Sequence, residues 1–358
     1  MITKQHNNIE RRGFDISTMS ALDMTTRGVF DISTCRYVVM SIIIMALVLV
    51  GCSDDTPEAN NEIRLNVEAL QMAEGTRATT IDDDDDLQGC DLRIDAYYHD
   101  TETAYLSNTK LHYDSEEQAA LKWKFWNGSQ LHYYWPFEGS KVAGGSTVAS
   151  TLDFVGFCPY DKPAYIAIPT YDKDDGVSFS CNLGSYMTNT AQADMDEYLI
   201  AVLKNQTYAD QVAHSGVPLQ FKHPFALVKF VIAEGSGTNV QVNSISIGGL
   251  YTSGTCTYNG STMTWGSYDG SAAMTITPED PLKYGTSSTE TYSLVVIPNN
   301  YGSKTLTVNG TWDSWSALTK DISTTVDINW QPGYIYTYNL TVTKYALKVD
   351  KEEFTEQW

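Results

Sequence analysis

The chain has 358 residues and a formal net charge of −21 at pH 7, because 44 acidic side chains face 23 basic ones. Phosphate backbones would repel such a chain, and no Lys/Arg cluster offsets the charge locally, so the composition argues against a nucleic-acid-binding protein. Its 23 Tyr, 8 Trp and 25 Gly favour strands and turns over helices and indicate an all-β protein.

One apolar run, Tyr37 to Val50, precedes the main body of the chain. It follows Arg36 and is shorter than the ~20 residues that a helix needs to cross a bilayer. We therefore interpret residues 1–51 as a signal peptide with an N-terminal extension. The extension is polar, which is unusual in front of a signal sequence, and one hypothesis is that translation starts at Met24.

The residues at the end of this run, Gly51-Cys52, resemble the lipobox of bacterial lipoproteins. The resemblance implies cleavage before Cys52 and an anchor of acyl chains, such as palmitate, on its thiol. Residues 52–61 then form an acidic linker. Its Ser53-Asp54-Asp55 looks like the signal that sends some lipoproteins to the outside of the cell outer membrane, and an ordinary polar linker is the alternative.

A half-buried strand is predicted directly after the linker, because apolar residues alternate with polar ones. Its inward residues are Ile63, Leu65, Val67 and Ala69. Next come Arg77-Ala78 and five aspartates, Asp82 to Asp86, whose mutual repulsion predicts a solvated, accessible loop. Calcium binding by these aspartates is the weaker alternative, because the interspersed Gly and distal Glu of a calcium loop are missing.

Short alternating strands continue to the C-terminus and predict two β-sandwiches. We expect an N-terminal domain over residues 62–210 and a C-terminal domain over residues 211–358, separated at the polar stretch Asn205 to Gly216. In the last clear strand, five residues share one face, as a sandwich core requires. They are Tyr334, Tyr336, Tyr338, Leu340 and Val342.

The sequence contains no catalytic, dinucleotide or phosphate-binding motif, so we expect no enzyme, no cofactor and no metal site. His223, between Phe221 and Phe225, is interpreted as a packing residue. Four cysteines remain beyond the lipid site, and their spacings match no zinc motif. They form either disulfides or separate buried thiols. They are Cys90, Cys158, Cys181 and Cys256.

An aromatic cluster allows two interpretations, because its rings either fill a core or form a platform on which sugars stack. It comprises Trp123, Phe125, Trp126, Tyr133, Tyr134 and Trp135.

The order of several motifs resembles the fimbrillin-like family, the subunits of lipoprotein-derived fimbriae. The motifs are the lipobox, the early alternating strand, Thr76-Arg77-Ala78-Thr79, Tyr134-Trp135-Pro136, Pro159-Tyr160, Phe221-Lys222-His223 and the Gly333-Tyr-x-Tyr-x-Tyr338 strand. The resemblance implies two transthyretin-like Greek-key β-sandwich domains. Pro224 replaces the family's small residue, and we expect it to bend its strand or place it at a sheet edge.

The resemblance also implies a structural subunit of an adhesive fimbria, or pilus. An arginine-specific protease would cut between Arg77 and Ala78 and remove the first strand, and another subunit would fill the vacancy by donor-strand exchange. The tail after Val342 either donates that strand or completes the second domain. Expected partners are other fimbrial subunits, the protease, the outer membrane and a receptor on a host or bacterial surface. The alternatives are a fimbrial tip or anchor component and a monomeric glycan-binding surface lipoprotein.

Overall fold

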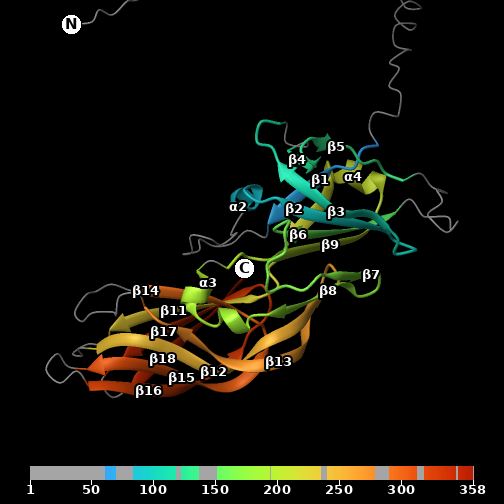
Figure 1. Ribbon diagram of the computed structural model, residues 1–358. Coiled ribbons are helices and arrows are strands. Elements are labelled where there is room, and N and C mark those ends of the chain that lie inside the picture. The colour runs from blue at the N-terminus through green and yellow to red at the C-terminus, as the bar shows by residue number, and fades with distance from the viewer. Residues whose placement is uncertain are drawn as a thin grey trace, which may run out of the picture. The chain divides into compact units, whose positions relative to one another are not determined.

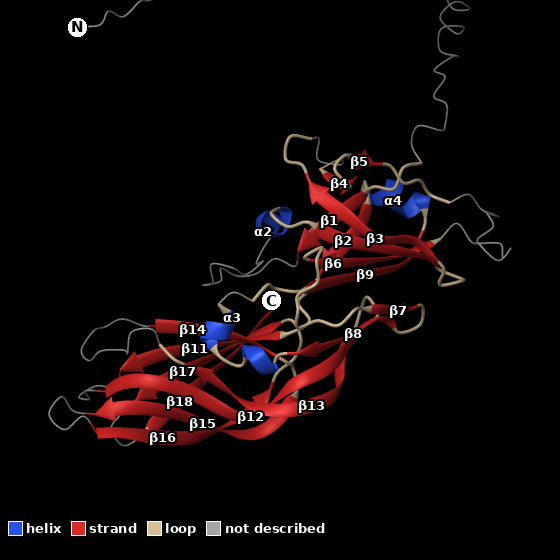
Figure 2. Ribbon diagram, in the orientation of Figure 1, coloured by secondary structure: helices blue, strands red, loops and turns tan. Residues whose placement is uncertain are grey.

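The computed structural model describes residues 61–69, 84–117, 122–136, 151–193, 195–234, 240–278, 290–312, 318–343 and 346–357. Residues 60–358 form one unit by their contacts. Strands make up most of it, and the helices are short (Figures 1 and 2). The expectation of an all-β protein is confirmed.

The first sheet has six strands in the order β5-β4-β3-β2-β6-β9, each antiparallel to its neighbour. These strands are β2 (Leu92–Tyr98), β3 (Ala104–Tyr113), β4 (Trp123–Trp126), β5 (Gln130–Leu131), β6 (Leu152–Cys158) and β9 (Leu199–Gln206). A separate parallel pair, β1 (Leu65–Ala69) and β10 (Val217–Phe221), shares a buried hydrophobic cluster with this sheet. We call it the first core.

Gly156 lets β10 approach the sheet closely. A Cβ at this position in β6 would lie only 2.5 Å from the ring of Phe221, which is fully buried. Glycine therefore makes room for the ring that seats β10 against β6.

Two more sheets enclose a larger second core. One has the order β16-β15-β12-β8-β7, with β13 also paired to β12, and the other has the order β14-β11-β17-β18. Their strands are β7 (Thr170–Asp172), β8 (Gly176–Asn182), β11 (Ala226–Glu234), β12 (Val240–Tyr258), β13 (Met263–Ile276), β14 (Glu290–Val296), β15 (Asn300–Trp312), β16 (Leu318–Asn329), β17 (Tyr334–Val342) and β18 (Leu347–Gln357).

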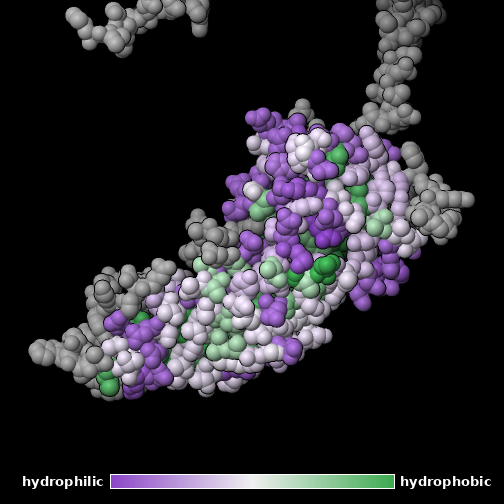
Figure 3. All heavy atoms as spheres, in the orientation of Figure 1, coloured by the Kyte–Doolittle hydropathy of each residue, from purple (hydrophilic) through white to green (hydrophobic). Residues whose placement is uncertain are grey.

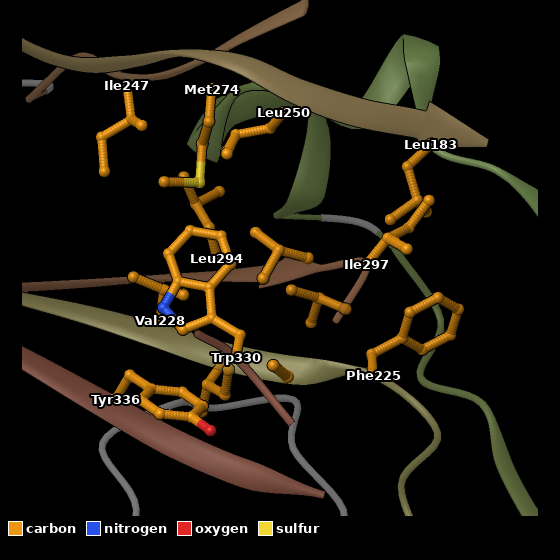
Figure 4. Close-up of a cluster of buried hydrophobic side chains, with 14 of the residues drawn as sticks. Leu183, Phe225, Val228, Ile247, Leu250, Met274, Leu294, Ile297, Trp330 and Tyr336 are labelled. Carbon is orange, nitrogen blue, oxygen red and sulfur yellow. The ribbon is translucent and has the colours of Figure 1, made fainter. Parts of the chain in front are cut away.

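Side chains from both of these sheets interlock in the second core, among them Val228 on β11, Ile247 on β12 and the ring of Trp330 (Figure 4). Of the five residues predicted to face inward on β17, Tyr336, Tyr338, Leu340 and Val342 are buried and Tyr334 is half-buried, while Ile335 on the opposite face is buried as well. The tail after Val342 pairs with β17 as β18 within its own chain.

The described helices are α2 (Asp84–Gln88), the 3-10 helix η3 (Gly184–Tyr186), α3 (Asn189–Gln192) and α4 (Tyr208–His214). A capping box starts α4, since Thr207 and Asp210 bond to each other's backbone N–H groups. Ser215, with φ 58° in the left-handed region, ends the helix.

The expectation for Pro224 is wrong in one respect. Pro224 does not lie in a strand, because β10 ends at Phe221 and β11 begins at Ala226, in different sheets. Pro224 lies in the connection, where the missing N–H costs no ladder bond.

The division into domains at residue 210 stays a prediction. Strands on either side of residue 210 are hydrogen-bonded to each other: β8, before it, pairs with β12, after it, and β1, before it, pairs with β10, after it.

Candidate functional site

The first strand, β1, lies between two partners. On one side it runs parallel to β10, with Leu65 opposite Val217 and Ala69 opposite Phe221. On the other side the chain just before it pairs with residues 133–135: Ile63 N–H donates to Tyr133 C=O at 2.7 Å, and Trp135 N–H donates to Asn61 C=O at 2.8 Å. The strand segment is therefore held by its main chain along both edges.

The side chains of the strand alternate as the sequence predicts. Ile63, Leu65 and Val67 are 2%, 5% and 7% exposed and lie in the first core, while Asn66 and Glu68 face solvent. The side chain of Ala69 lies outside the described residues. The groove that receives β1 thus provides three apolar positions at a spacing of two residues.

Gln211 on α4 contacts the main chain of this segment directly. Its Nε2 donates to Glu62 C=O at 2.8 Å, and its Oε1 accepts from Arg64 N–H at 2.7 Å. The same Oε1 accepts from the indole N–H of Trp135 at 3.0 Å. Gln211 and Trp135 are 5% and 3% exposed, so these bonds lie away from water.

Gly216 gives β1 room to approach. Its φ is 149°, and a Cβ there would lie 3.0 Å from Asn66 N and 3.1 Å from Asn66 Cβ. A side chain at this position would press on the main chain of β1. We call β10, α4, Gly216 and residues 133–135 together the β1 groove.

Gln211 and α4 were not predicted, because the stretch from Asn205 to Gly216 is polar and was interpreted as a domain boundary. The available signal was Thr207 three residues before Asp210, the pattern of a capping box. The hydrogen bonds from Thr207 lower the pKa of the Asp210 carboxyl, so the cap is fully charged near neutral pH.

The other predicted site residues lie outside the described part of the chain. They are the lipid attachment site Cys52 and the cleavage positions Arg77 and Ala78. Of the five aspartates, Asp84 to Asp86 belong to α2. Among the described residues, no group of three or more His, Cys, Asp or Glu side chains is arranged to hold a metal ion. Within the same residues, no helix is both long and apolar enough to span a membrane.

The aromatic cluster divides between the core and the surface. Phe125 and Trp135 are buried, whereas Trp126 is 37% and Tyr134 50% exposed. The rings therefore do not form one continuous platform.

Trp126 does line a hollow of about 400 Å³ together with Asn108, Lys110, Asn127 and Tyr160. Lys110 lies 2.6 Å from Asp91, and this hydrogen bond raises the lysine pKa and keeps it protonated. In the view of Figure 3, hydrophilic side chains cover most of the surface around β2 to β5.

The four cysteines are free thiols. Cys90 is the least buried, and a hydrogen bond from Cys158 lowers the pKa of its thiol. His223 is 3% exposed and packs as predicted, and its Nδ1 lies 3.2 Å from a carboxylate oxygen of Glu197, a pairing that the sequence did not reveal.

A family model described as fimbrillin-like matches residues 76–358. A search of curated proteins finds no match. Among solved structures, a protein from Bacteroides ovatus ATCC 8483, provisionally described as a cell adhesion protein, is 14% identical with a TM-score of 0.50, over 84% of this chain and 99% of that one.

Two further structures match with lower TM-scores. A Bacteroides uniformis ATCC 8492 protein with the same provisional description is 16% identical with a TM-score of 0.45, over 82% of this chain and 98% of its own. The tip fimbrial protein Mfa3 of Porphyromonas gingivalis, truncated at its C-terminus, is 9% identical with a TM-score of 0.41, over 83% of this chain and all of its own.

Proposed function

Because the chain belongs to the fimbrillin-like family, we propose that it is a structural subunit of cell-surface fimbriae and supports adhesion. It is made as a lipoprotein precursor, anchored in the outer membrane through Cys52. Proteolysis between Arg77 and Ala78 removes β1, and a strand of another subunit takes its place.

The observation that supports this proposal is the way β1 is held. All of its described contacts are non-covalent: its main chain bonds to β10, Gln211 and residues 133–135, and its apolar side chains pack in the first core. Arg77 follows the last residue of β1, Ala69, by eight positions in the sequence. A cut at Arg77 therefore leaves β1 attached to the rest of the protein by these contacts alone.

The free energy of the vacancy is large. Burial of a large apolar side chain contributes ~1.5 to 3 kcal/mol, so losing Ile63, Leu65 and Val67 forfeits roughly 4 to 9 kcal/mol. That is comparable with the whole stability of a domain, about 5 to 15 kcal/mol. The empty groove would also expose the unpaired N–H and C=O groups of β10, which favour capture of another strand.

The cleavage step is tested with an arginine-specific protease on purified protein, with size followed by light scattering. We expect cleavage after Arg77 and growth of oligomers, and we expect Arg77→Ala to remain monomeric. Cleavage without oligomers, or oligomers formed equally well by Arg77→Ala, would refute the mechanism.

The anchor is tested by metabolic labelling with a fatty acid. Label should enter the wild-type precursor and be absent from Cys52→Ala. Label that persists in Cys52→Ala would place the lipid elsewhere.

A second candidate function, glycan binding, is favoured by the hollow beside Trp126. The exposed indole offers a face for a sugar ring, and Asn108 and Asn127 carry amide donors and acceptors. Wild type and Trp126→Ala on a glycan array test it: a sugar bound only by the wild type would support this function.

A further inference from the structure

The parallel ladder between β1 and β10 is continued by a side chain. In a parallel pair, a residue that faces residue i of the other strand bonds to the two neighbours of i. Its N–H donates to the C=O of residue i−1, and its C=O accepts from the N–H of residue i+1. Leu65 faces Val217, so the residue facing Ile63 would be Ser215. Ser215 is in the left-handed conformation that ends α4 and takes no part in the β1–β10 ladder.

The carboxamide of Gln211 takes the place of that missing residue. Its Nε2 donates to Glu62 C=O and its Oε1 accepts from Arg64 N–H, the two groups that flank Ile63. The next bond, from Val217 N–H to Arg64 C=O at 2.8 Å, belongs to β10 itself. Gln211 and β10 thus form one uninterrupted set of hydrogen-bonding groups along β1.

The carboxamide is held in place by groups that do not belong to β1. The indole of Trp135 donates to Oε1 and fixes which end of the amide is the acceptor. The backbone C=O of Gln211 accepts from Gly216 N–H at 2.9 Å, and the capping box fixes the start of α4. None of these contacts is made by β1, so we expect Gln211 to stay oriented for the next strand, which lowers the entropic cost of binding.

We propose that Gln211 reads the main chain of whichever strand occupies the β1 groove and fixes the direction of that strand, while the three apolar positions of the groove set its register. The occupant is an extended peptide, parallel to β10, with apolar residues at the three positions of Ile63, Leu65 and Val67. Gln211 contacts only peptide groups, so it accepts any residue at the positions of Glu62 and Arg64. That a second subunit supplies this peptide rests on the function proposed above.

Gln192 provides an internal control. It is a buried glutamine on α3, and its Nε2 and Oε1 bond to the C=O and N–H of Val295 on β14 at 2.8 and 2.7 Å. The chemistry is the same, but β14 is not the strand that leaves. A substitution of Gln192 should therefore affect stability without affecting occupancy of the β1 groove.

The experiment uses the full chain, nicked at a site for an unrelated protease inserted after Thr79. Nicking leaves the first strand bound without a covalent link, and a labelled peptide of residues 60–70 is added in excess to replace it. The release rate and the peptide affinity are measured for wild type, Gln211→Met and Gln192→Met. A second peptide carries an ester in place of the amide between Ile63 and Arg64, which removes the Arg64 N–H.

We expect Gln211→Met to weaken peptide binding roughly 10- to 100-fold, since a net hydrogen bond contributes about a factor of ten and two are lost. Gln192→Met should stay within about twofold of wild type. The ester should weaken peptide binding by wild type about tenfold but should weaken binding by Gln211→Met only slightly. This difference is the coupling expected of a direct bond between Gln211 and the Arg64 N–H. Equal ester penalties in both proteins, or unchanged binding by Gln211→Met, would overturn the proposal.

Gln211→Glu keeps the outcome decisive if Gln211→Met does not fold. Its carboxylate still accepts from Arg64 N–H and cannot donate to Glu62 C=O, so binding should weaken while the ester penalty persists. Loss of the ester penalty in this variant would also overturn the proposal. If the peptide measurements agree with these expectations but cleavage at Arg77 yields no oligomers, the role of Gln211 is supported and the proposed fimbrial function is refuted.

Discussion

Gly216 shows how one residue controls access to the β1 groove. We predict that Gly216→Ala destabilises the protein by about 1 to 3 kcal/mol, because the new Cβ meets the main chain of β1 at 3.0 Å. Urea unfolding measures the change.

Gly128→Ala is the matched control. It has a positive φ of 77° but no atom within 4 Å of the new Cβ, so it reports the backbone strain alone. If both variants lose the same stability, contact with β1 is not the cause.

Cys90 is predicted to be the most reactive of the four described thiols. A hydrogen bond from Cys158 lowers the pKa of Cys90, whereas that bond raises the pKa of Cys158 and burial raises that of Cys181 to about 12. A lowered pKa means that the thiolate appears at lower pH.

Alkylation with iodoacetamide over a pH series, read by peptide mass spectrometry, measures this order. Cys90 should be modified first and at the lowest pH, and Cys181 and Cys256 should stay protected in the folded protein. Faster modification of Cys181 would contradict the expected order.

At the scale of single residues, the sequence predicts what depends on local pattern. The inward residues Ile63, Leu65 and Val67 were evident from alternation alone. The roles of Gln211 and Glu197 were not evident. Gln211 bonds to Arg64 and Glu197 lies beside His223, and no local sequence pattern links either pair. A polar residue that is buried by its partners looks like any surface residue in the sequence.

At the scale of elements, β1 should contribute strongly to stability. We predict that Leu65→Ala costs about 2 to 5 kcal/mol, since a 5% exposed side chain leaves a cavity in the first core. The exposed neighbour Asn66 provides the control, and Asn66→Ala should stay within about 0.5 kcal/mol of wild type. Denaturant unfolding measures both. Equal effects would mean that β1 is not packed as described.

The length of strands was harder to predict than their presence. The apolar residues of β12 are densest from Val240 to Leu250, but the strand continues to Tyr258 as it pairs with β13 and β8. β13 has mostly exposed or half-exposed residues, so this hairpin has little apolar alternation to detect. The strand expected at Pro224 is absent for the opposite reason, because two adjacent apolar strands in different sheets give one continuous apolar run in the sequence.

At the scale of the whole described unit, β6 and β9 serve both cores. Every residue of β6 is buried: Phe154 lies in the first core, and its neighbour Val155 lies in the second. On β9, Leu199 and Ile200 divide in the same way. A strand buried on both faces has no polar side, which explains the apolar run from Phe154 to Cys158 in the sequence.

A buried carboxylate connects the same regions. Asp153 on β6 is fully buried and accepts hydrogen bonds from the Tyr171 hydroxyl on β7 and from Asn205 N–H, with His99 Nδ1 at 2.9 Å. β7 belongs to a sheet of the second core, whereas β6 belongs to the sheet of the first. Breaking either region would leave this charge with fewer partners, at a high cost.

We therefore predict that the two cores unfold together. Leu65→Ala in the first core and Val228→Ala in the second should each lower the midpoint of one shared thermal transition, because unfolding either core exposes a face of β6 and β9. Calorimetry on the purified chain measures the transitions, and tryptophan fluorescence and circular dichroism should give coincident midpoints. Two domains that fold independently on either side of residue 210 would instead give two transitions, with each substitution moving only its own. That result would support a domain boundary at residue 210 and would contradict the idea that β6 and β9 couple the two cores.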